Sequence, residues 1–375
     1  MMIAKTASWM LEIAVFLAVL FAVQIPLRKK ELPLPRAIVF ILKAVMIPGS
    51  ALLFVAIESR FSYRHGDVLA ALYVVLLGDA AASVLEYAIR RLGQPRDRSA
   101  GKRPCQLGLL GLLSAVCCLG VFLYGTANVG HVAVKTHTWT AQGLTRTHTF
   151  AFAADLHIGS AQSADTLEEF CRQVNAADPE FVILGGDITD ELTSYDAMTA
   201  GYRILSEIEA PVYFVYGNHD RQPNAQFFGG RTYSDEQLTQ TIRDAGIRIL
   251  TDEYVKAADD LILLGREDIG AGDGRKAWEA LDDPFEGTGA LIVADHQPYD
   301  EEQLAAERSA LQLSGHTHAG QFWPLQLVYR LLGLPAYGEF EEPGTLLYVT
   351  AGEGVWMMPL RTEAHCEWDL ITLVP

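Results

Sequence analysis

Four long apolar stretches before residue 128 constrain the fold of this 375-residue chain more than any other feature. They cover residues 9–27, 37–57, 68–89 and 107–127. Each has about 20 residues, the length at which a helix crosses the hydrocarbon core of a bilayer. One such stretch is compatible with a buried core helix, whereas four in succession with short charged connections predict a transmembrane domain of four helices over residues 1–127. The first stretch is an unconvincing signal peptide, because it has no clear small-residue cleavage site and further apolar stretches follow it.

The basic residues between these stretches predict their orientation. Residues 28–36 and 90–103 together hold ten Lys and Arg, whereas the segment before the first stretch and the second connection hold three. Connections rich in Lys and Arg remain in the cytoplasm. We therefore expect a multi-pass protein of the cell membrane, with the N-terminus and everything after residue 127 on the extracytoplasmic side.

Charge divides the chain at the same position. Residues 1–127 contain 14 Lys and Arg against 7 Asp and Glu, and residues 128–375 contain 15 against 39, so the net charges are +7 and −24. An acidic polar part argues against nucleic acid as a partner, because a binding groove for nucleic acid needs a basic face. The expected organisation is a bilayer anchor, a linker or lead-in strand at 128–148, and a soluble domain at 149–375.

Short apolar runs alternate with helical stretches in the soluble part. We expect strands at 149–154, 181–184, 212–215, 248–250, 261–264, 290–294, 311–313 and 345–350, and helices at 164–177, 195–208 and 235–245. Alternation of strands and helices is typical of a layered α/β domain.

Residues of the kind that bind metals follow five of these strands. The motifs are Asp155-Leu-His157, Gly186-Asp187-x-x-Asp190, Gly217-Asn218-His219-Asp220, Asp295-His296 and Gly315-His316-Thr-His318. Each motif alone is compatible with an ordinary turn, but ligands of α/β sheets bind beyond the carboxyl ends of strands, and five motifs in order favour one shared site. Carboxylate, imidazole and amide groups without thiolates suit Mn, Fe or Zn.

These five motifs resemble those of the calcineurin-like metallophosphoesterase superfamily. The continuation Gly-His-Thr-His-Ala-Gly-Gln at 315–321 is similar to that of its bacterial membrane-anchored or exported branch. The resemblance extends from about residue 150 to the C-terminus. It implies a four-layer αββα sandwich and hydrolysis of a phosphoester by a metal-bridging hydroxide.

The resemblance also implies a set of ligands for two divalent ions, with Mn favoured over Fe or Zn. One ion would be bound by Asp155, His157, Asp187 and His318. The other would be bound by Asp187, Asn218, His296 and His316, so that Asp187 bridges the two.

Two further groups of residues are candidates for catalysis and substrate binding. The resemblance implies that His219 protonates the leaving oxygen or stabilises charge on the phosphoryl group, and that Asp220 orients His219. The irregular segment 221–234 is either an ordinary surface loop or a loop that binds substrate through Arg221, Phe227, Phe228 and Arg231.

Three positions depart from the usual pattern of the family. Ala319 occupies a position where glycine is common, Asp295 one where a small or hydroxyl residue is usual, and the turn 351–354 lacks an arginine. None of these changes removes a ligand, but Asp295 and Glu353 would add negative charge near the site.

The leading hypothesis is a membrane-anchored enzyme that hydrolyses a phosphoester or pyrophosphate bond outside the cytoplasm. Its substrate would be a phosphorylated small molecule or lipid derived from the membrane or envelope. One alternative is a pyrophosphatase that faces the cytoplasm and acts on a nucleotide-linked lipid. A less favoured alternative is a non-catalytic or sensor protein that retains the fold.

Overall fold

The computed structural model describes residues 106–375 apart from 160–161, 286–287, 300–309, 343 and 357–358. The first three predicted apolar stretches lie outside the described residues. The fourth lies in helix α4 (Gln106–Val129). No helix in the described part of the chain meets the length and hydropathy needed to cross a membrane. The chain divides into two compact units, residues 1–126 and 127–375.

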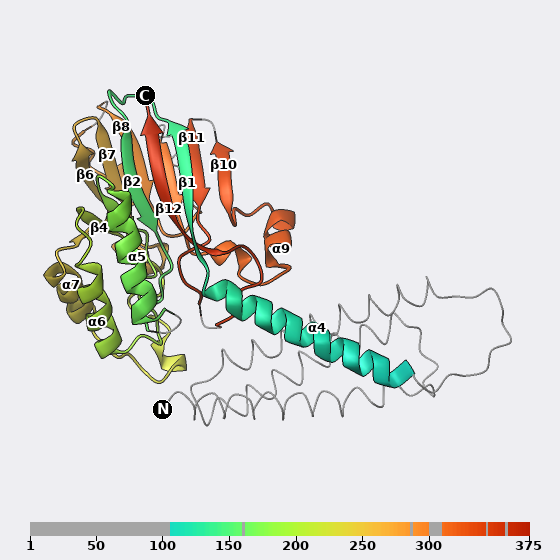
Figure 1. Ribbon diagram of the computed structural model, residues 1–375. Coiled ribbons are helices and arrows are strands. Elements are labelled where there is room, and N and C mark those ends of the chain that lie inside the picture. Colours follow the sequence, from blue (N-terminus) through green and yellow to red (C-terminus); the bar gives the residue numbers. More distant parts are fainter. Residues whose placement is uncertain (1–105, 160–161, 286–287, 300–309, 343, 357–358) are drawn as a thin grey trace. The chain divides into compact units, whose positions relative to one another are not determined.

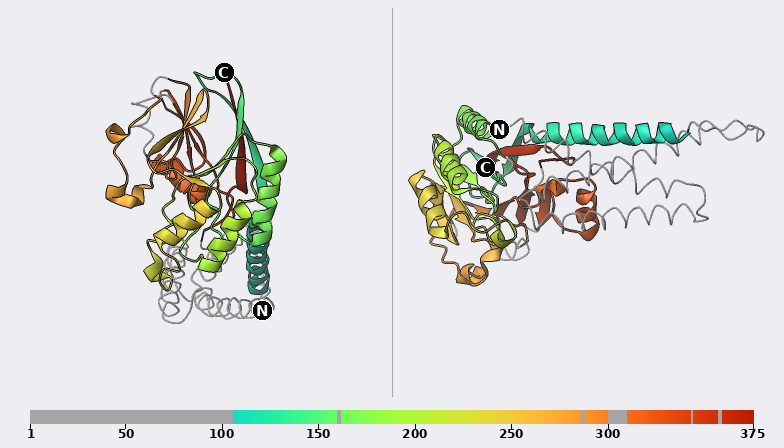
Figure 2. Two further views of the ribbon diagram at one scale, coloured as in Figure 1. Left: turned by 90° about the vertical axis from the view of Figure 1, so that its left-hand side faces the viewer. Right: turned by 90° about the horizontal axis from the view of Figure 1, so that it is seen from below.

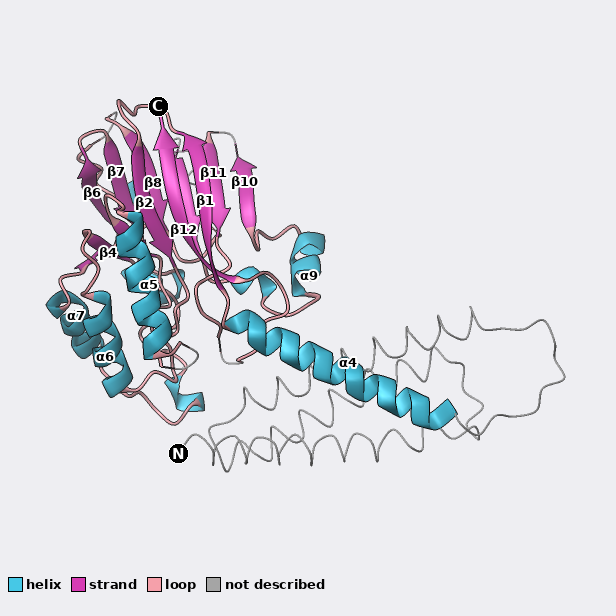
Figure 3. Cartoon of the chain, in the orientation of Figure 1, coloured by secondary structure: helices cyan, strands magenta, loops and turns pink. Residues whose placement is uncertain are grey.

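The second unit contains two six-stranded sheets (Figures 1 and 3). In spatial order, the first sheet consists of β1 (Val132–Thr140), β12 (Cys366–Val374), β2 (His148–Ala153), β3 (Val182–Leu184), β4 (Val212–Phe214) and β5 (Arg248–Ile249). The second consists of β10 (Gly338–Glu342), β11 (Thr345–Val349), β9 (Ala310–Ser314), β8 (Ala290–Ala294), β7 (Leu261–Gly265) and β6 (Glu253–Ala258).

Strand β2 illustrates how the sequence divides its apolar side chains between two cores. Ala151 and Ala153 pack with the helices on one face, whereas Phe150 and Phe152 pack between the two sheets on the other. Successive side chains of a strand point to opposite faces, so this all-apolar strand is buried on both sides. Figure 2 shows the two sheets as separate layers.

Three helices cover the outer face of the first sheet: α5 (Ala164–Ala177), α6 (Tyr195–Leu205) and α7 (Asp235–Asp244). In α5, Leu167, Phe170, Cys171 and Val174 recur at helical spacing and are buried. Trp278 packs on the outer face of the second sheet. The second unit is thus an αββα sandwich, as the resemblance implied.

Several elements differ from the sequence-based expectation. Residues 128–148 were expected to form either a linker or a lead-in strand. The structure has the strand: β1 pairs in parallel with β12 along nine residues. Strands β6, β10 and β12 and helix α9 (Leu325–Leu332) were not predicted. Strand β10 reads Gly-Glu-Phe-Glu-Glu, a polar edge strand with little apolar signal.

Strand direction places the five motifs together. Strands β2, β3 and β4 are mutually parallel in the first sheet, and β7, β8, β9 and β11 are mutually parallel in the second. The motifs after β2, β3 and β4 therefore leave the first sheet at one edge, and those after β8 and β9 leave the second sheet at one edge. This arrangement allows residues more than 150 positions apart to share one site.

Candidate metal centre

Two groups of Asp and His side chains occupy the ends of these strands, and all of them are buried except the half-buried His316. The first consists of Asp155, His157 and His318, and the second of Asp187, His296 and His316. In each group the ligand atoms all lie within 4.8 Å of one another. Each group corresponds to residues that the resemblance assigned to the same ion.

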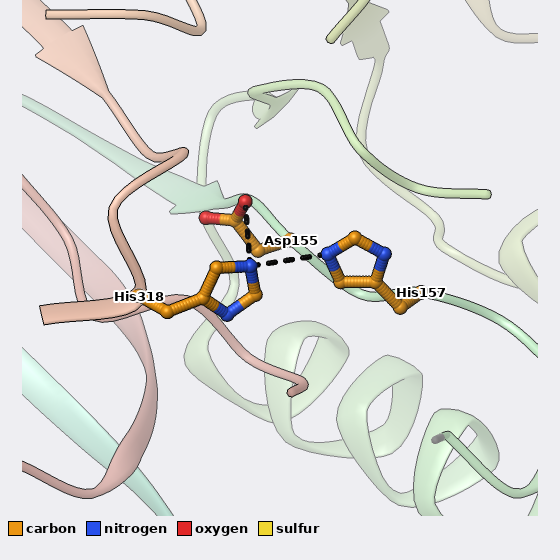
Figure 4. A group of neighbouring side chains, drawn as sticks. All are labelled: Asp155, His157 and His318. Carbon is orange, nitrogen blue, oxygen red and sulfur yellow. Dashed lines mark hydrogen bonds and ion pairs between the residues drawn. The ribbon is translucent and has the colours of Figure 1, made fainter. Parts of the chain in front are cut away.

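Nitrogen and oxygen atoms of the first group converge on one point (Figure 4). His318 Nε2 lies 3.1 Å from His157 Nε2 and 3.4 Å from Asp155 Oδ1. The second group is similarly close, because His296 Nε2 lies 3.0 Å from Asp187 Oδ2. His296 Nε2 is also 4.0 Å from Asp155 Oδ1, so the two groups adjoin.

The outer hydrogen bonds of two histidines indicate which ring nitrogen can bind a metal. His296 Nδ1 donates to Gly185 O at 2.8 Å, and His157 Nδ1 lies 3.1 Å from Asp190 Oδ2. A neutral imidazole that donates from Nδ1 presents a lone pair at Nε2. When His296 is neutral, this lone pair faces an oxygen of Asp187, and two acceptors at that distance need a proton or a metal cation between them. These residues therefore fit a pair of bound cations.

Asn218 adds an oxygen to the same region. Its Oδ1 atom is buried and has no hydrogen-bond partner among the described residues. Buried polar atoms are rarely left without a partner, so an unpaired amide oxygen beside two Asp/His groups is suited to a metal ligand. The amide would contribute coordination without additional negative charge.

The backbone of the site is strained. Asp155, His157, Asp187, His316 and His318 all have a positive φ, between 49° and 71°. This region is unfavourable for residues with a side chain, and such strain concentrates at functional sites. Gly217 is needed for close packing, because a Cβ atom there would lie 2.3 Å from Asp187 Oδ1.

Burial and neighbouring charges set the protonation of these side chains. Burial lowers the pKa of His316 to about 4 and that of His318 well below its ordinary value. Burial alone would raise the pKa of Asp187, but the charge of His296 holds it below the usual range. Neutral imidazoles and an ionised carboxylate are the forms that bind metals. Bound cations would favour the same forms.

The structure corrects the expected partner of His219. Its Nδ1 atom lies 2.8 Å from Glu191 Oε2, which the sequence analysis did not single out. Asp220 instead accepts backbone N–H groups at both oxygens. Its Oδ2 atom accepts from Asp187 at 2.9 Å and from Gly217 at 2.7 Å, and its Oδ1 atom accepts from Ile188 at 2.9 Å. Its carboxylate is thus used to hold the turns that carry the ligands. The signal for Glu191 was its position directly after the Gly-Asp-x-x-Asp motif.

His219 lies against the first group of ligands. Its ring centroid is 6.0 Å from that of His157, and its backbone N–H donates to Asp187 Oδ1 at 2.7 Å. Burial alone would lower its pKa, but the charge of Asp187 and the hydrogen bond to Glu191 raise it to about 9. The ring of Trp356 also stacks on it at 4.9 Å, a contact that the sequence did not suggest.

The four side chains proposed for substrate binding differ in their partners and exposure. Arg221 forms two 2.8 Å hydrogen bonds with Glu267, and its guanidinium lies 3.6 Å from the centroid of the Tyr216 ring. Arg231 pairs with Asp235. Phe227 is 71% exposed and Phe228 is partly buried. Both arginines thus have protein partners.

The departures from the family pattern add no uncompensated negative charge. Asp295 pairs with Arg275 at 2.6 Å. Burial raises the pKa of Glu353 well above its ordinary value, and its carboxyl group is hydrogen-bonded to Gln162. The charge expected at Asp295 is therefore compensated by Arg275. Ala319 has a φ of 50°, which explains why glycine is common there.

Comparison with known proteins gives a consistent result. Residues 148–320 match the family described as calcineurin-like phosphoesterase. A "Transmembrane protein with metallophosphoesterase domain" from Danio rerio is 28% identical over 237 residues, covering 59% of this chain and 52% of the relative. An "Uncharacterized metallophosphoesterase" from Helicobacter pylori is also 28% identical, covering 59% and 58%. The chain thus spans little more than half the length of these relatives.

Further matches come from a bacterial enzyme and a solved structure. The "Phosphodiesterase YaeI" from Escherichia coli is 27% identical over 237 residues, covering 60% of this chain and 81% of the relative. The crystal structure of a dimetal phosphatase from Danio rerio covers 54% of this chain and 87% of that one, at a TM-score of 0.38 and 12% identity.

The sequence match covers the strands and turns that hold the two Asp/His groups. The fold, the two Asp/His groups and the family match therefore all indicate the same kind of domain for residues 148–320. Residues 148–320 form a metallophosphoesterase domain of the calcineurin-like family.

Proposed function

We propose that this chain is a membrane-anchored phosphohydrolase that acts on a phosphoester or pyrophosphate bond outside the cytoplasm. The observation that carries the proposal is the pair of adjacent, largely buried Asp/His groups at the strand ends. Two such groups are suited to two divalent ions, and oxygen and imidazole ligands suit Mn, Fe or Zn. The family resemblance favours Mn among these. When bound, the ions would activate water and stabilise charge on the phosphoryl oxygens.

The chain's own residues would position the reacting groups. Asp187 lies in the second group and also accepts the backbone N–H of His219, so the turn that carries His219 is held against the ligands. The contact between His219 Nδ1 and Glu191 leaves Nε2 available to donate a proton to the leaving oxygen. His219 is only 14% exposed at its side chain, which favours a fixed ring orientation.

Anchoring is supported by the four apolar stretches and by relatives whose names include "transmembrane". The basic connections favour an extracytoplasmic domain. A substrate derived from the membrane or envelope follows from this placement, because an anchored enzyme meets such molecules at the bilayer surface.

Hydrolysis of two model substrates tests the chemistry. The full chain, purified in detergent and freed of metal, is assayed on bis(p-nitrophenyl) phosphate and p-nitrophenyl phosphate with and without Mn. We expect Mn-dependent turnover that is lost in Asp187→Asn and strongly reduced in His219→Ala. Absence of bound metal by elemental analysis in the sample supplied with Mn would contradict the proposal. The ratio of diester to monoester turnover would narrow the substrate class.

A protease-protection experiment tests the location of the domain. In right-side-out vesicles or intact cells, added protease should cleave within residues 128–375 if the domain is extracytoplasmic. Protection of the domain until the membrane is permeabilised would instead favour the cytoplasm-facing pyrophosphatase.

A further inference from the structure

Helix α9 (Leu325–Leu332) exposes its apolar residues. It begins seven residues after the metal-group residue His318, and none of its residues is buried. The exposed large apolar residues of this segment are Trp323, Leu325, Leu327, Val328, Leu331, Leu332 and Leu334. Leu331 is 78% exposed and Leu332 67%. We call residues 323–334 the apolar segment.

A polar residue of α9 faces the protein instead. The backbone N–H of Gln326 donates to Glu363 Oε2 at 2.8 Å, and its side-chain amide donates to Ala319 O at 3.2 Å. A surface helix of a soluble domain normally turns its apolar face to the core and its polar face to water. In α9 this order is reversed, so its outward face is suited to an apolar environment.

Charge distinguishes the apolar segment from the rest of its unit. No Asp or Glu occurs from residue 321 to residue 338, and Arg330 is the only Lys or Arg there. Residues 128–375 as a whole carry 39 acidic residues. An apolar helix with a basic residue and no acidic residue is compatible with anionic lipid headgroups, and tryptophan is enriched at the membrane–water interface.

One short loop, residues 361–365, is hydrogen-bonded both to the end of α4 and to the apolar segment. The side chain of Asn128, in the last turn of α4, donates to two carbonyl oxygens of residues 361–365 at 3.2 and 2.7 Å. The backbone N–H groups of Trp323 and Gln326 donate to side chains of the same loop at 3.0 and 2.8 Å. Within residues 127–375, loop 361–365 thus contacts both Asn128, which follows the last predicted apolar stretch in the sequence, and the start of the apolar segment. This continuity favours lipid over a separate protein as the occupant.

We propose that the apolar segment is a bilayer-contact surface that lies at the boundary between headgroups and acyl chains of a phospholipid membrane. The inference rests on the membrane anchoring in the proposed function. The segment follows directly from the turn His318–Gly320, which carries a ligand of the first group. Its insertion would hold the metal centre at the bilayer surface, where the phosphate of a lipid or lipid-linked substrate is located.

Quenching of tryptophan fluorescence tests the contact. The full chain is reconstituted into nanodiscs of phosphatidylcholine and phosphatidylglycerol, with brominated acyl chains in one sample and iodide in the surrounding water in another. The chain has six tryptophans, so the signal of Trp323 is taken as the difference between the unmodified chain and Trp323→Phe. We expect brominated lipid to remove most of the Trp323 signal and iodide to have little effect on it.

A charge substitution and a matched control sharpen the experiment. Leu327→Glu with Leu331→Glu should abolish quenching of Trp323 by brominated lipid, because two carboxylates cannot enter the acyl region at low cost. The control Val134→Glu with Tyr195→Glu adds the same charge at exposed apolar positions outside the apolar segment and should leave the quenching unchanged. Both variants should retain Mn-dependent turnover of the soluble p-nitrophenyl substrates.

The other outcomes overturn the inference in distinguishable ways. Quenching of Trp323 by iodide alone would place the segment in water, and resistance to both quenchers would show that residues 1–105 or a second copy cover it. Failure of the chain to co-elute with nanodiscs would overturn the anchoring together with this inference. Loss of turnover on soluble substrates in the unmodified chain would instead contradict the proposed chemistry.

Discussion

At the residue scale, the contact between His219 and Glu191 determines which acidic residue orients the His219 ring. Both Glu191 and Asp220 are buried acidic residues near its imidazole. Of these two residues, Glu191 contacts the ring through its carboxylate. The oxygens of Asp220 accept the backbone N–H groups of Asp187, Ile188, Thr189 and Gly217 instead. Glu191 is thus a positioning residue for a proton donor, and Asp220 stabilises the turns.

Substitution of Glu191 should affect turnover more than stability. Glu191→Gln keeps the size of the side chain but removes the charge that orients His219, so kcat should fall by about ten- to a hundredfold, with KM little changed. Thermal unfolding should stay near that of the unmodified chain. The exposed Glu209→Gln serves as a control for loss of one carboxylate, and unchanged kcat in Glu191→Gln would contradict the role.

The ion pair between Arg275 and Asp295 gives a second prediction at this scale. The side chains are 9% and 1% exposed. Arg275→Met would leave the carboxylate of Asp295 buried without its guanidinium, which should lower the free energy of unfolding by about 3–5 kcal/mol. The double variant Arg275→Met with Asp295→Ala should recover much of this loss in urea denaturation. Equal destabilisation of the single and double variants would argue that Arg275 acts through packing.

At the scale of elements, Asp260 joins the two sheets. It lies in the turn between β6 and β7 of the second sheet, and it accepts hydrogen bonds from the backbone and hydroxyl of Thr145. Its Oδ1 atom lies 2.7 Å from Nε2 of His148, in β2 of the first sheet. The hydrogen bonds from Thr145 hold the pKa of Asp260 well below its usual value of 3.8.

The sign of this shift gives a pH dependence of stability. A carboxyl group with a lowered folded-state pKa stabilises the fold at pH values above its unfolded-state pKa, and the contribution disappears as the pH falls through the folded-state pKa. Asp260→Asn should therefore be less stable than the unmodified chain at pH 7, and the difference should shrink below about pH 4. Urea denaturation at several pH values measures this, and a difference that is constant with pH would contradict the assignment.

The elements differ in how well the sequence predicted them. The expected helix at 164–177 is observed with the same bounds, because Ser163 caps it and four apolar side chains recur at helical spacing. Strand β12 was missed, although it lies between β1 and β2, because the buried Glu367 and Asp369 interrupt its apolar pattern. Glu367 accepts the hydroxyl of Tyr337 at 2.9 Å, and Asp369 that of Tyr348 at 2.7 Å. These partners are distant in sequence, so local patterns could not reveal why the carboxyl groups are tolerated.

At the scale of the whole molecule, the metal centre should contribute to stability. Its residues come from both sheets, so ions bound there would hold the sheets together. A ligand that binds only the folded state stabilises it, by about 2.7 kcal/mol at a hundred times its Kd. Treatment with a chelator should lower the melting temperature of the full chain, and added Mn should restore it. Asp187→Asn should melt at nearly the same temperature with and without Mn, whereas a full Mn response in that variant would argue that the ions bind elsewhere.

The sequence by itself determined the residues of the candidate centre, because each predicted ligand directly follows an apolar strand and the ends of parallel strands meet at one edge. It also determined the division between an apolar, basic part and an acidic, layered part, since that division depends on composition alone. Tertiary structure decided the partner of His219, the neutralisation of Asp295 by Arg275 and the outward face of α9. Each of these depends on which distant side chain occupies the neighbouring space, and that choice is made by the packing of the two sheets and their connecting loops.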